Sequence, residues 1–350
     1  MFRFLFILAC FPLLFGYHII GDFILYPGIL FPLVIIFWRR RISKTLIFLF
    51  ILAVFLSVFS PIRWISLGYY LFGLVYVFQQ YIVNRSWIER TFNVLIVLIL
   101  FMIIMDFLDI DVISSFTNYE RRFLSDSRSI LPVKRPTGFY REPSSLGYFL
   151  GTMYAVATKN ALKINYRSLV FCGLSTMTMS FMLIFFVAWF LFAQSRFKLI
   201  KIFVFIGSTF ALFYPRIATL YQAIHRADVP LVEINLSIIK RFVQPSYAVY
   251  EYVQTSVSSL LIKGFGPGGY KEYLMETYSY LLGSDLRAGY LLNILGNYMM
   301  SFGVLFALIF LLILFKRFKR GEAFLLCLLL MQGLPVLHPV FLLTGLKVKD

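Results

Sequence analysis

The sequence has few of the residues from which soluble enzymes usually build their sites. Its 350 residues include only three cysteines and three histidines, and 14% of them are charged. Cys10, Cys172 and Cys327 all lie inside apolar segments, so they offer neither a disulfide framework nor the spacing of metal ligands. No paired carboxylates, His/Cys cluster or HExxH pattern is present that would hold a metal. The sequence therefore predicts no metal site and no cofactor.

Acidic residues are scarce as well. There are 16 Asp and Glu against 33 Lys and Arg, which gives a net charge of +17. Nucleic-acid binding is not indicated, because the basic residues fall in short clusters between apolar runs, the distribution typical of positively charged inner loops. The chain is 60% hydrophobic and 19% aromatic, and its apolar runs approach twenty residues. We expect an all-α polytopic membrane protein with no nucleic-acid partner.

About eleven transmembrane helices (ten to twelve) are predicted, forming a single integral membrane domain over residues 1–350. The first is expected to be uncleaved, since residues 1–15 resemble a signal peptide without a small-residue cleavage site. Residues 168–194 are too long for one upright span and short for two; two spans keep the later basic clusters on the inner face. The predicted spans are 4–20, 23–38, 45–60, 65–83, 91–110, 144–161, 168–179, 180–194, 199–214, 288–315 and 323–343.

Two long segments are predicted on the outer face, at 111–143 and 215–287. In the second, apolar residues recur at helical spacing from Ile217 to Ile224 and from Leu231 to Phe242, which predicts amphipathic helices in the membrane interface. Both segments carry cations where few are expected on this side. For most of them we favour a solvated surface or lipid head groups as the explanation.

Arg141, Glu142 and Pro143 stand where an apolar run begins. Pro143 suits the first position of a helix, and the first N–H groups of such a helix can bind a phosphate or another anion. Arg135, Arg141 and Arg241 each lie near the start of a helix or an apolar face, and a guanidinium fork is a natural clamp for pyrophosphate.

Several of these side chains have two readings. Glu142 either complements the helix dipole or takes a proton from a sugar hydroxyl. His225, beside Arg226, is either an interfacial side chain or part of a binding surface. Tyr273 follows the glycine cluster 264–269 and either stacks on a sugar or belongs to the interfacial aromatic belt. The cluster itself lacks a following Lys-Ser/Thr, so it does not indicate a P-loop.

Four sequence elements, in this order, resemble the O-antigen polymerase (Wzy) and O-antigen ligase superfamily. Residues 138–147 (GFYREPSSLG) are similar to its Glu-Pro-Ser element, which opens a helix. Residues 174–180 are similar to its apolar run ending in Thr-x-Ser, with Phe181 in place of the usual arginine. Arg241 with Gly264–Gly266 resembles its arginine and Gly-x-Gly pair, and residues 290–303 resemble the helix that follows. The His-Asn often found before that helix is absent; Ala288-Gly289 stand there, near Arg287.

The resemblance implies a GT-C-like membrane glycosyltransferase that polymerises surface polysaccharide without a metal. Its substrate would be an oligosaccharide on undecaprenyl pyrophosphate, transferred with inversion to the sugar hydroxyl of another lipid-linked unit, and a chain-length regulator is a candidate partner. The implied catalytic residues are Arg141, Glu142 and Arg241, and the residues expected to bind pyrophosphate or sugar are Arg135, His225, Arg226, Arg287 and Tyr273. The enzyme would lie in the bacterial plasma membrane with its site facing outward. An O-antigen ligase and a transporter of a lipid-linked or anionic substrate are the alternatives. Apolar spans, with the polar residues gathered at one face, are expected to disfavour transport.

Overall fold

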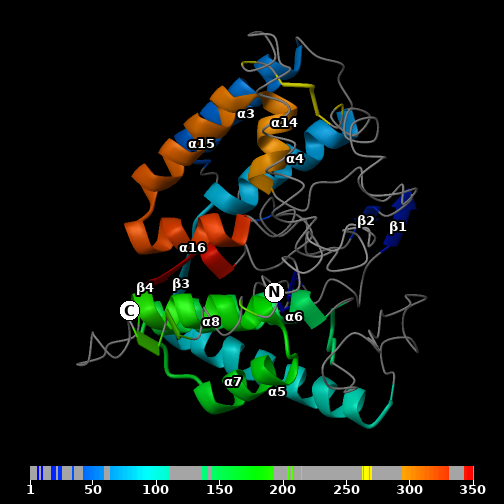
Figure 1. The fold of residues 1–350 in the computed structure, drawn as a ribbon, viewed down its shortest axis with the longest axis vertical. Helices are drawn as coiled ribbons and strands as arrows, with labels where there is room; N and C mark the ends of the chain where they lie inside the picture. Colours follow the sequence, from blue (N-terminus) through cyan, green and yellow to red (C-terminus); the bar gives the residue numbers. More distant parts are fainter. Residues whose placement is uncertain are drawn as a thin grey trace. The chain divides into compact units, whose positions relative to one another are not determined.

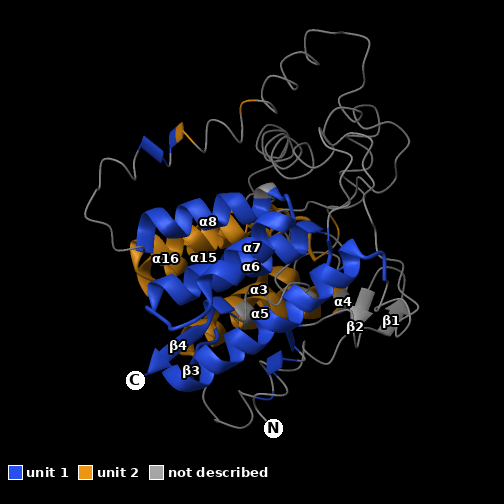
Figure 2. Ribbon diagram, turned by 90° about the horizontal axis from the view of Figure 1, so that it is seen from below, with its two compact units in different colours: residues 1–41, 79–206, 337–350 blue, residues 42–78, 207–336 orange. Residues whose placement is uncertain are grey.

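A computed structural model of the chain describes residues 6–7, 9–10, 17–20, 23–25, 34, 42–58, 64–110, 136–140, 143–192, 203–204, 206–207, 214, 262, 264–267, 269, 294–330 and 343–349. This part of the chain is mostly helical. It falls into two compact units, which we describe separately (Figure 2). Unit 1 comprises residues 1–41, 79–206 and 337–350, and unit 2 comprises residues 42–78 and 207–336.

The helices of unit 1 come from the middle of the chain (cyan to green in Figure 1). They are α5 (Arg85–Phe107), α6 (Pro143–Lys159), α7 (Tyr166–Ser175) and α8 (Met179–Phe192). The 23 residues of α5 correspond to roughly 35 Å at 1.5 Å per residue, which exceeds the hydrocarbon thickness of about 30 Å. Among the described helices, α5 alone is long and apolar enough to cross a membrane by length and composition.

Glycine allows α6 and α8 to pack closely together. Gly147 and Gly151 are one turn apart on α6 and face α8. A Cβ atom at residue 147 would overlap the Thr178 hydroxyl, and one at residue 151 would lie 2.9 Å from the Cβ of Ile184. Small residues four apart are the usual device for bringing membrane helices into backbone proximity. The same spacing therefore fixes which face of α6 contacts α8.

The stretch 168–194 contains two helices, as predicted. The break lies at Thr176–Thr178, where Met177 has a φ of 47°. The Thr176 hydroxyl donates to the Gly173 carbonyl oxygen at 2.7 Å and lies 2.9 Å from the Thr178 hydroxyl, so the turn satisfies its own polar groups. α7 has 10 residues, fewer than the roughly twenty that a full crossing needs, in keeping with a stretch predicted to be short for two spans.

Unit 2 consists of helices from both sides of the sequence (blue and orange in Figure 1). They are α3 (Lys44–Val58), α4 (Trp64–Phe78), α14 (Ile294–Phe302), α15 (Val304–Arg317) and α16 (Arg320–Leu330). Their core is aromatic. The Tyr298 ring lies 5.6 Å from Tyr70 and 5.3 Å from Phe310, and its hydroxyl donates to the Tyr70 carbonyl oxygen at 3.1 Å. The hydrogen bond lets a tyrosine be buried where phenylalanine would otherwise be expected.

The predicted span at 288–315 is broken. α14 ends at Phe302 and α15 begins at Val304, and Gly303 between them has φ 90° and ψ 165°. Glycine is the residue that adopts this conformation without steric strain. The expectation that residues 288–315 form one continuous span is therefore wrong at Gly303.

Four short strands correct the expectation of an all-helical chain. β1 (Tyr17–Ile20) pairs antiparallel with β2 (Phe23–Leu25), and β3 (Tyr81–Asn84) pairs parallel with β4 (Leu346–Lys349). The predicted helices at 4–20, 23–38 and 65–83 are wrong in these places. Each of β1, β2 and β3 is rich in β-branched or aromatic residues, and a Gly-Asp dipeptide separates β1 from β2 in the sequence, which is a hairpin signal.

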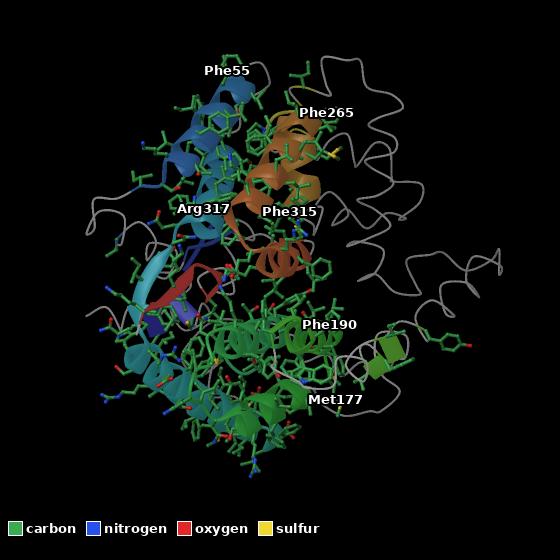
Figure 3. All side chains as sticks on the ribbon, turned by 90° about the vertical axis from the view of Figure 1, so that its left-hand side faces the viewer. Phe55, Met177, Phe190, Phe265, Phe315 and Arg317 are labelled. Carbon is green, nitrogen blue, oxygen red and sulfur yellow. The ribbon has the colours of Figure 1, made fainter. Side chains whose placement is uncertain are left out.

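Helices in both units carry exposed apolar faces. α5 exposes Val94, Val97 and Phe101 along one side. In unit 2, Phe55 on α3 and Phe315 on α15 are 58% and 49% exposed, and both are labelled in Figure 3. Other large apolar side chains of these two helices are also exposed: Ile47, Phe48, Ile51, Val54, Leu305, Leu308 and Leu312. Contiguous surfaces of this kind normally face a membrane or a partner, since water does not favour them.

Candidate active site at the start of α6

The predicted site residues lie outside the described part of the chain. This holds for all eight: Arg135, Arg141, Glu142, His225, Arg226, Arg241, Tyr273 and Arg287. For Arg141 and Glu142, however, the structure describes the chain on both sides, at 136–140 and from Pro143 onward. These flanking residues show how the start of α6 is built.

α6 begins at Pro143, which confirms the predicted helix start. Proline is favoured there because the first helical N–H has no partner within the helix. The first turns of α6 are held by neighbours on two sides. A Cβ atom at Gly138 would lie 3.3 Å from a methyl group of Leu146, and Gly147 faces the Thr178 side chain at the break between α7 and α8.

A turn precedes Arg141, and a buried carboxylate holds it. The Tyr140 N–H donates to the Thr137 carbonyl oxygen at 3.0 Å, and Gly138 within the turn has a φ of 55°. Asp106, at the C-terminal end of α5, is 2% exposed. Its Oδ2 accepts hydrogen bonds from the N–H groups of Thr137 at 2.9 Å and Gly138 at 2.8 Å.

Tyr140 anchors the same turn through its side chain. It is 2% exposed and lies 5.6 Å, ring to ring, from Phe149 on α6. Its hydroxyl donates to the Cys10 carbonyl oxygen at 2.8 Å. Arg141 and Glu142 thus occupy sequence positions between a buried, hydrogen-bonded tyrosine and the buried first residue of α6.

The opposite end of α5 is tied to the turn between α6 and α7. Arg85 donates to the carbonyl oxygens of Asn160 at 3.0 Å and Ala161 at 3.1 Å. Glu89 accepts from the Lys163 N–H at 2.8 Å. Cations predicted to lie on the inner face belong to this end of unit 1: Arg85, Arg90, Lys159, Lys163 and Arg167. The basic end and the Asp106 end of α5 are separated by most of the helix.

Unit 2 has a comparable basic end. Arg317, in the last turn of α15, donates to the Ser43 hydroxyl at 2.5 Å and lies 5.8 Å from the centre of the Phe78 ring (Figure 3). Ser43 precedes α3 and Phe78 ends α4, so three helix ends meet here. Further cations flank these ends in sequence: Lys44, Lys316, Lys319 and Arg320.

The Gly-x-Gly segment of the second outer segment packs on the break between α14 and α15. The Phe265 N–H donates to the Met300 carbonyl oxygen at 2.8 Å, and the Gly266 N–H donates to the Ser301 carbonyl oxygen at 3.0 Å. Gly264, with φ 68°, lies so close to the break that an added Cβ atom would be 2.6 Å from the Gly303 nitrogen. The segment therefore satisfies carbonyl groups that the end of α14 leaves without partners.

Asp106, a buried carboxylate beside the candidate site, was not among the predicted site residues. It was counted within the predicted span 91–110 and was not singled out. The signal was available, because a carboxylate within an apolar membrane run is a candidate for function by default. Its partners Thr137 and Gly138 lie 31 and 32 positions further along the chain, and only the fold brings them together.

Among the described residues, no three His, Cys, Asp or Glu side chains come together in a group that could hold a metal ion. The chain matches no protein-family model, and neither curated proteins nor solved structures include a match.

Proposed function

We propose that this chain is a membrane glycosyltransferase that polymerises lipid-linked oligosaccharide repeat units. It would transfer a glycan from undecaprenyl pyrophosphate to a sugar hydroxyl of a second lipid-linked unit. In this reaction the bond between the anomeric carbon and the pyrophosphate oxygen breaks, and the pyrophosphate leaves with the electron pair. The acceptor oxygen bonds to the same carbon from the opposite face, which inverts it, and the hydroxyl proton passes to a base.

The proposal rests on the described residues that flank Arg141 and Glu142 in the sequence. The pair follows a turn whose backbone N–H groups bond to a buried carboxylate, and it precedes the first residue of a closely packed helix. A site that must hold reacting groups in fixed geometry is best built on such a rigid frame. In the proposed reaction Glu142 orients or deprotonates the acceptor hydroxyl.

Charge stabilisation would come from arginines and from the helix itself. Guanidinium groups of Arg141 and Arg241 bind the departing pyrophosphate through paired N–H donors. The first N–H groups of α6 add a positive dipole end at the same position. Arg135, Arg226 and Arg287 are further candidates for binding pyrophosphate, and His225 and Tyr273 for binding sugar or pyrophosphate.

The proposal places the chain in the bacterial plasma membrane, with about eleven spans and the start of α6 facing the exterior. The exposed apolar faces of α3, α5 and α15 support a lipid surrounding. Among the described residues, Arg85 in unit 1 and Arg317 in unit 2 each bind at helix ends of their unit, which is consistent with the positive-inside rule. The start of α6 lies at the other end of α5.

Transport of a lipid-linked or anionic substrate is the second candidate, and one observation favours it. Discontinuous helices are typical of transporters, and the described part contains a break at Gly303 and another at Thr176–Thr178. A ligase, which would deliver the glycan to a different acceptor, is the third. These three functions predict different products, so one experiment separates them.

The experiment measures the extension of a synthetic lipid-linked repeat unit by the purified protein, together with the glycan ladder of cells carrying each variant. Arg141→Ala, Glu142→Gln and Arg241→Ala should each lower the extension rate by roughly 10²-fold or more, while the protein still inserts. Glu120→Gln and Arg121→Ala are matched controls from the first outer segment. Normal long chains from all three site variants would contradict the proposal.

The surface glycans that disappear in the variants distinguish polymerisation from transport, and the acceptor used by the purified protein identifies a ligase. If single repeat units still reach the cell surface while long chains disappear, polymerisation is affected. If all surface units disappear, transport is affected. If the purified protein moves the glycan only to an acceptor that is not linked to pyrophosphate, it is a ligase.

A further inference from the structure

Asp106 combines deep burial with a defined set of partners. It is 2% exposed and follows an apolar run, residues 94–105, in the same helix. A buried carboxylate is costly unless hydrogen bonds replace its hydration. Here a single oxygen, Oδ2, receives two neighbouring backbone N–H groups, from Thr137 and Gly138.

Two successive N–H groups on one anion form a compact binding concavity. Gly138, with a φ of 55°, adopts the left-handed conformation of this turn without steric strain, and its N–H and that of Thr137 donate to the same oxygen. Hydrogen bonds to an ionised acceptor are about twice as strong as neutral ones. These two hydrogen bonds therefore fix the turn to the end of α5, and the Tyr140 N–H closes the turn itself by donating to the Thr137 carbonyl oxygen.

This turn leads directly to the proposed catalytic pair. Tyr140 closes the turn and Pro143 starts α6, so only Arg141 and Glu142 stand between two anchored positions. Each step between Cα atoms is about 3.8 Å, and covalent geometry therefore links the position of the pair to the position of the turn. Resting on the proposed function, we infer that Asp106 is a positioning residue, which holds the turn at 137–140 and thereby aligns Arg141 and Glu142 for glycan transfer.

A residue that only stabilises the fold and a residue that aligns the pair predict different kinetics. Misplacing a reacting group by about 1 Å can cost roughly 10²-fold in rate, and it lowers kcat more than it raises KM. General destabilisation lowers the amount of active enzyme instead, and leaves the KM and the per-molecule rate of the remainder unchanged.

The test compares Asp106→Ala, Asp106→Asn and a matched control, Asp109→Asn. Asp109 lies three residues further along, is exposed, and has a φ of 62° that asparagine tolerates well. For each purified variant, two quantities are measured: kcat and KM for extension of the lipid-linked repeat, and hydrogen exchange of the amides at 137 and 138. The exchange measurement reports the turn directly and does not depend on activity.

Asp106→Ala should lower kcat by roughly 10²-fold with KM within about threefold of wild type, and should raise exchange at both amides by roughly tenfold or more. Asp106→Asn keeps an oxygen in the position of Oδ2, so it should restore kcat to within about tenfold of wild type. Asp109→Asn should match wild type in both measurements. If Asp106→Ala does not insert, Asp106→Asn carries the test, with an intermediate kcat and raised exchange expected.

The inference is overturned if Asp106→Ala keeps the wild-type kcat, or if kcat falls while both amides remain protected. It is also overturned if Asp106→Asn is as impaired as Asp106→Ala, or if it is the only inserted variant and has wild-type values in both measurements. A wild-type protein that extends no substrate is a separate result: it contradicts the proposed function, and the inference falls with it.

Discussion

Gly264→Ala should strongly destabilise the contact between the Gly-x-Gly segment and the break after α14. Alanine at a φ of 68° costs about 1–2 kcal/mol. The new Cβ atom would lie 2.6 Å from the Gly303 nitrogen and 2.8 Å from the Met300 carbonyl oxygen, both backbone atoms that cannot rotate away. Overpacking of this kind costs typically 1–3 kcal/mol.

The clash also separates the groups that form two backbone hydrogen bonds, from Phe265 to Met300 and from Gly266 to Ser301. Each contributes about 0.5–1.5 kcal/mol. These contributions overlap, because relieving the clash is what breaks the bonds. We therefore expect a loss of about 3–5 kcal/mol in the free energy that holds the segment on the helix break.

Gly68→Ala is the matched control. Gly68 lies within α4 in the same unit, and a Cβ atom there would meet nothing within 4 Å. The same chemical change at this position should stabilise the protein by roughly 0.5–1 kcal/mol, because alanine is the better helix former. The same added methyl group is thus expected to lower stability at Gly264 and to raise it at Gly68.

The assay is thermal unfolding in detergent, combined with hydrogen exchange at residues 264–267. Gly264→Ala should lower the midpoint by several degrees and raise exchange of the amides at 265 and 266, and Gly68→Ala should leave exchange there unchanged. A Gly264→Ala variant with the wild-type midpoint and protected amides would refute the argument that backbone contact at this point requires glycine.

Two further substitutions test the anchors of unit 1. Arg85→Ala removes the donor to the carbonyl oxygens that follow α6 and should lower stability by about 1–3 kcal/mol, whereas Arg90→Ala, at an exposed position of the same helix, should change it by less than about 0.5 kcal/mol. Tyr140→Phe removes the hydroxyl that donates to the Cys10 carbonyl oxygen and should cost about 1 kcal/mol. Denaturation in detergent measures the free energy of unfolding of each variant. If Arg85→Ala loses no more stability than Arg90→Ala, the role of Arg85 as an anchor is contradicted. If Tyr140→Phe is as stable as wild type, the role of the Tyr140 hydroxyl is contradicted.

Local signals in the sequence predicted the parts of the fold that local forces determine. The start of α6 at Pro143 follows from the fixed φ of proline and its missing N–H. The division of 168–194 into two helices followed from the placement of charges, and the structure confirms it. The break was predicted between residues 179 and 180 and lies slightly earlier, at Thr176–Thr178, because Met177 in the left-handed region has no signature in the sequence.

Other features could not be deduced because they depend on distant partners. β3 pairs with β4 from the far end of the chain, and an apolar run such as Tyr81–Val83 has the same composition in a strand or a buried helix. Gly303 was missed for a related reason: a single glycine in an apolar run is tolerated in a helix. Gly303 is recognisable as a helix break only in the folded chain, where the segment at Gly264 packs against it.

Within each unit, the same physical rule places irregular backbone. A helix that ends among apolar neighbours leaves carbonyl or N–H groups that those neighbours cannot satisfy. In unit 1 the turn before α6 meets this need with the carboxylate of Asp106, and in unit 2 the segment at Gly264 donates to the carbonyls of Met300 and Ser301. Such breaks are stable only where other parts of the protein satisfy the exposed backbone groups. The positions where the chain departs from a helix are therefore also positions where backbone groups and charged side chains can reach a substrate. The placement of Arg141 and Glu142 directly after one of these covered turns is the reason to seek chemistry there rather than among the more numerous cations of the basic ends.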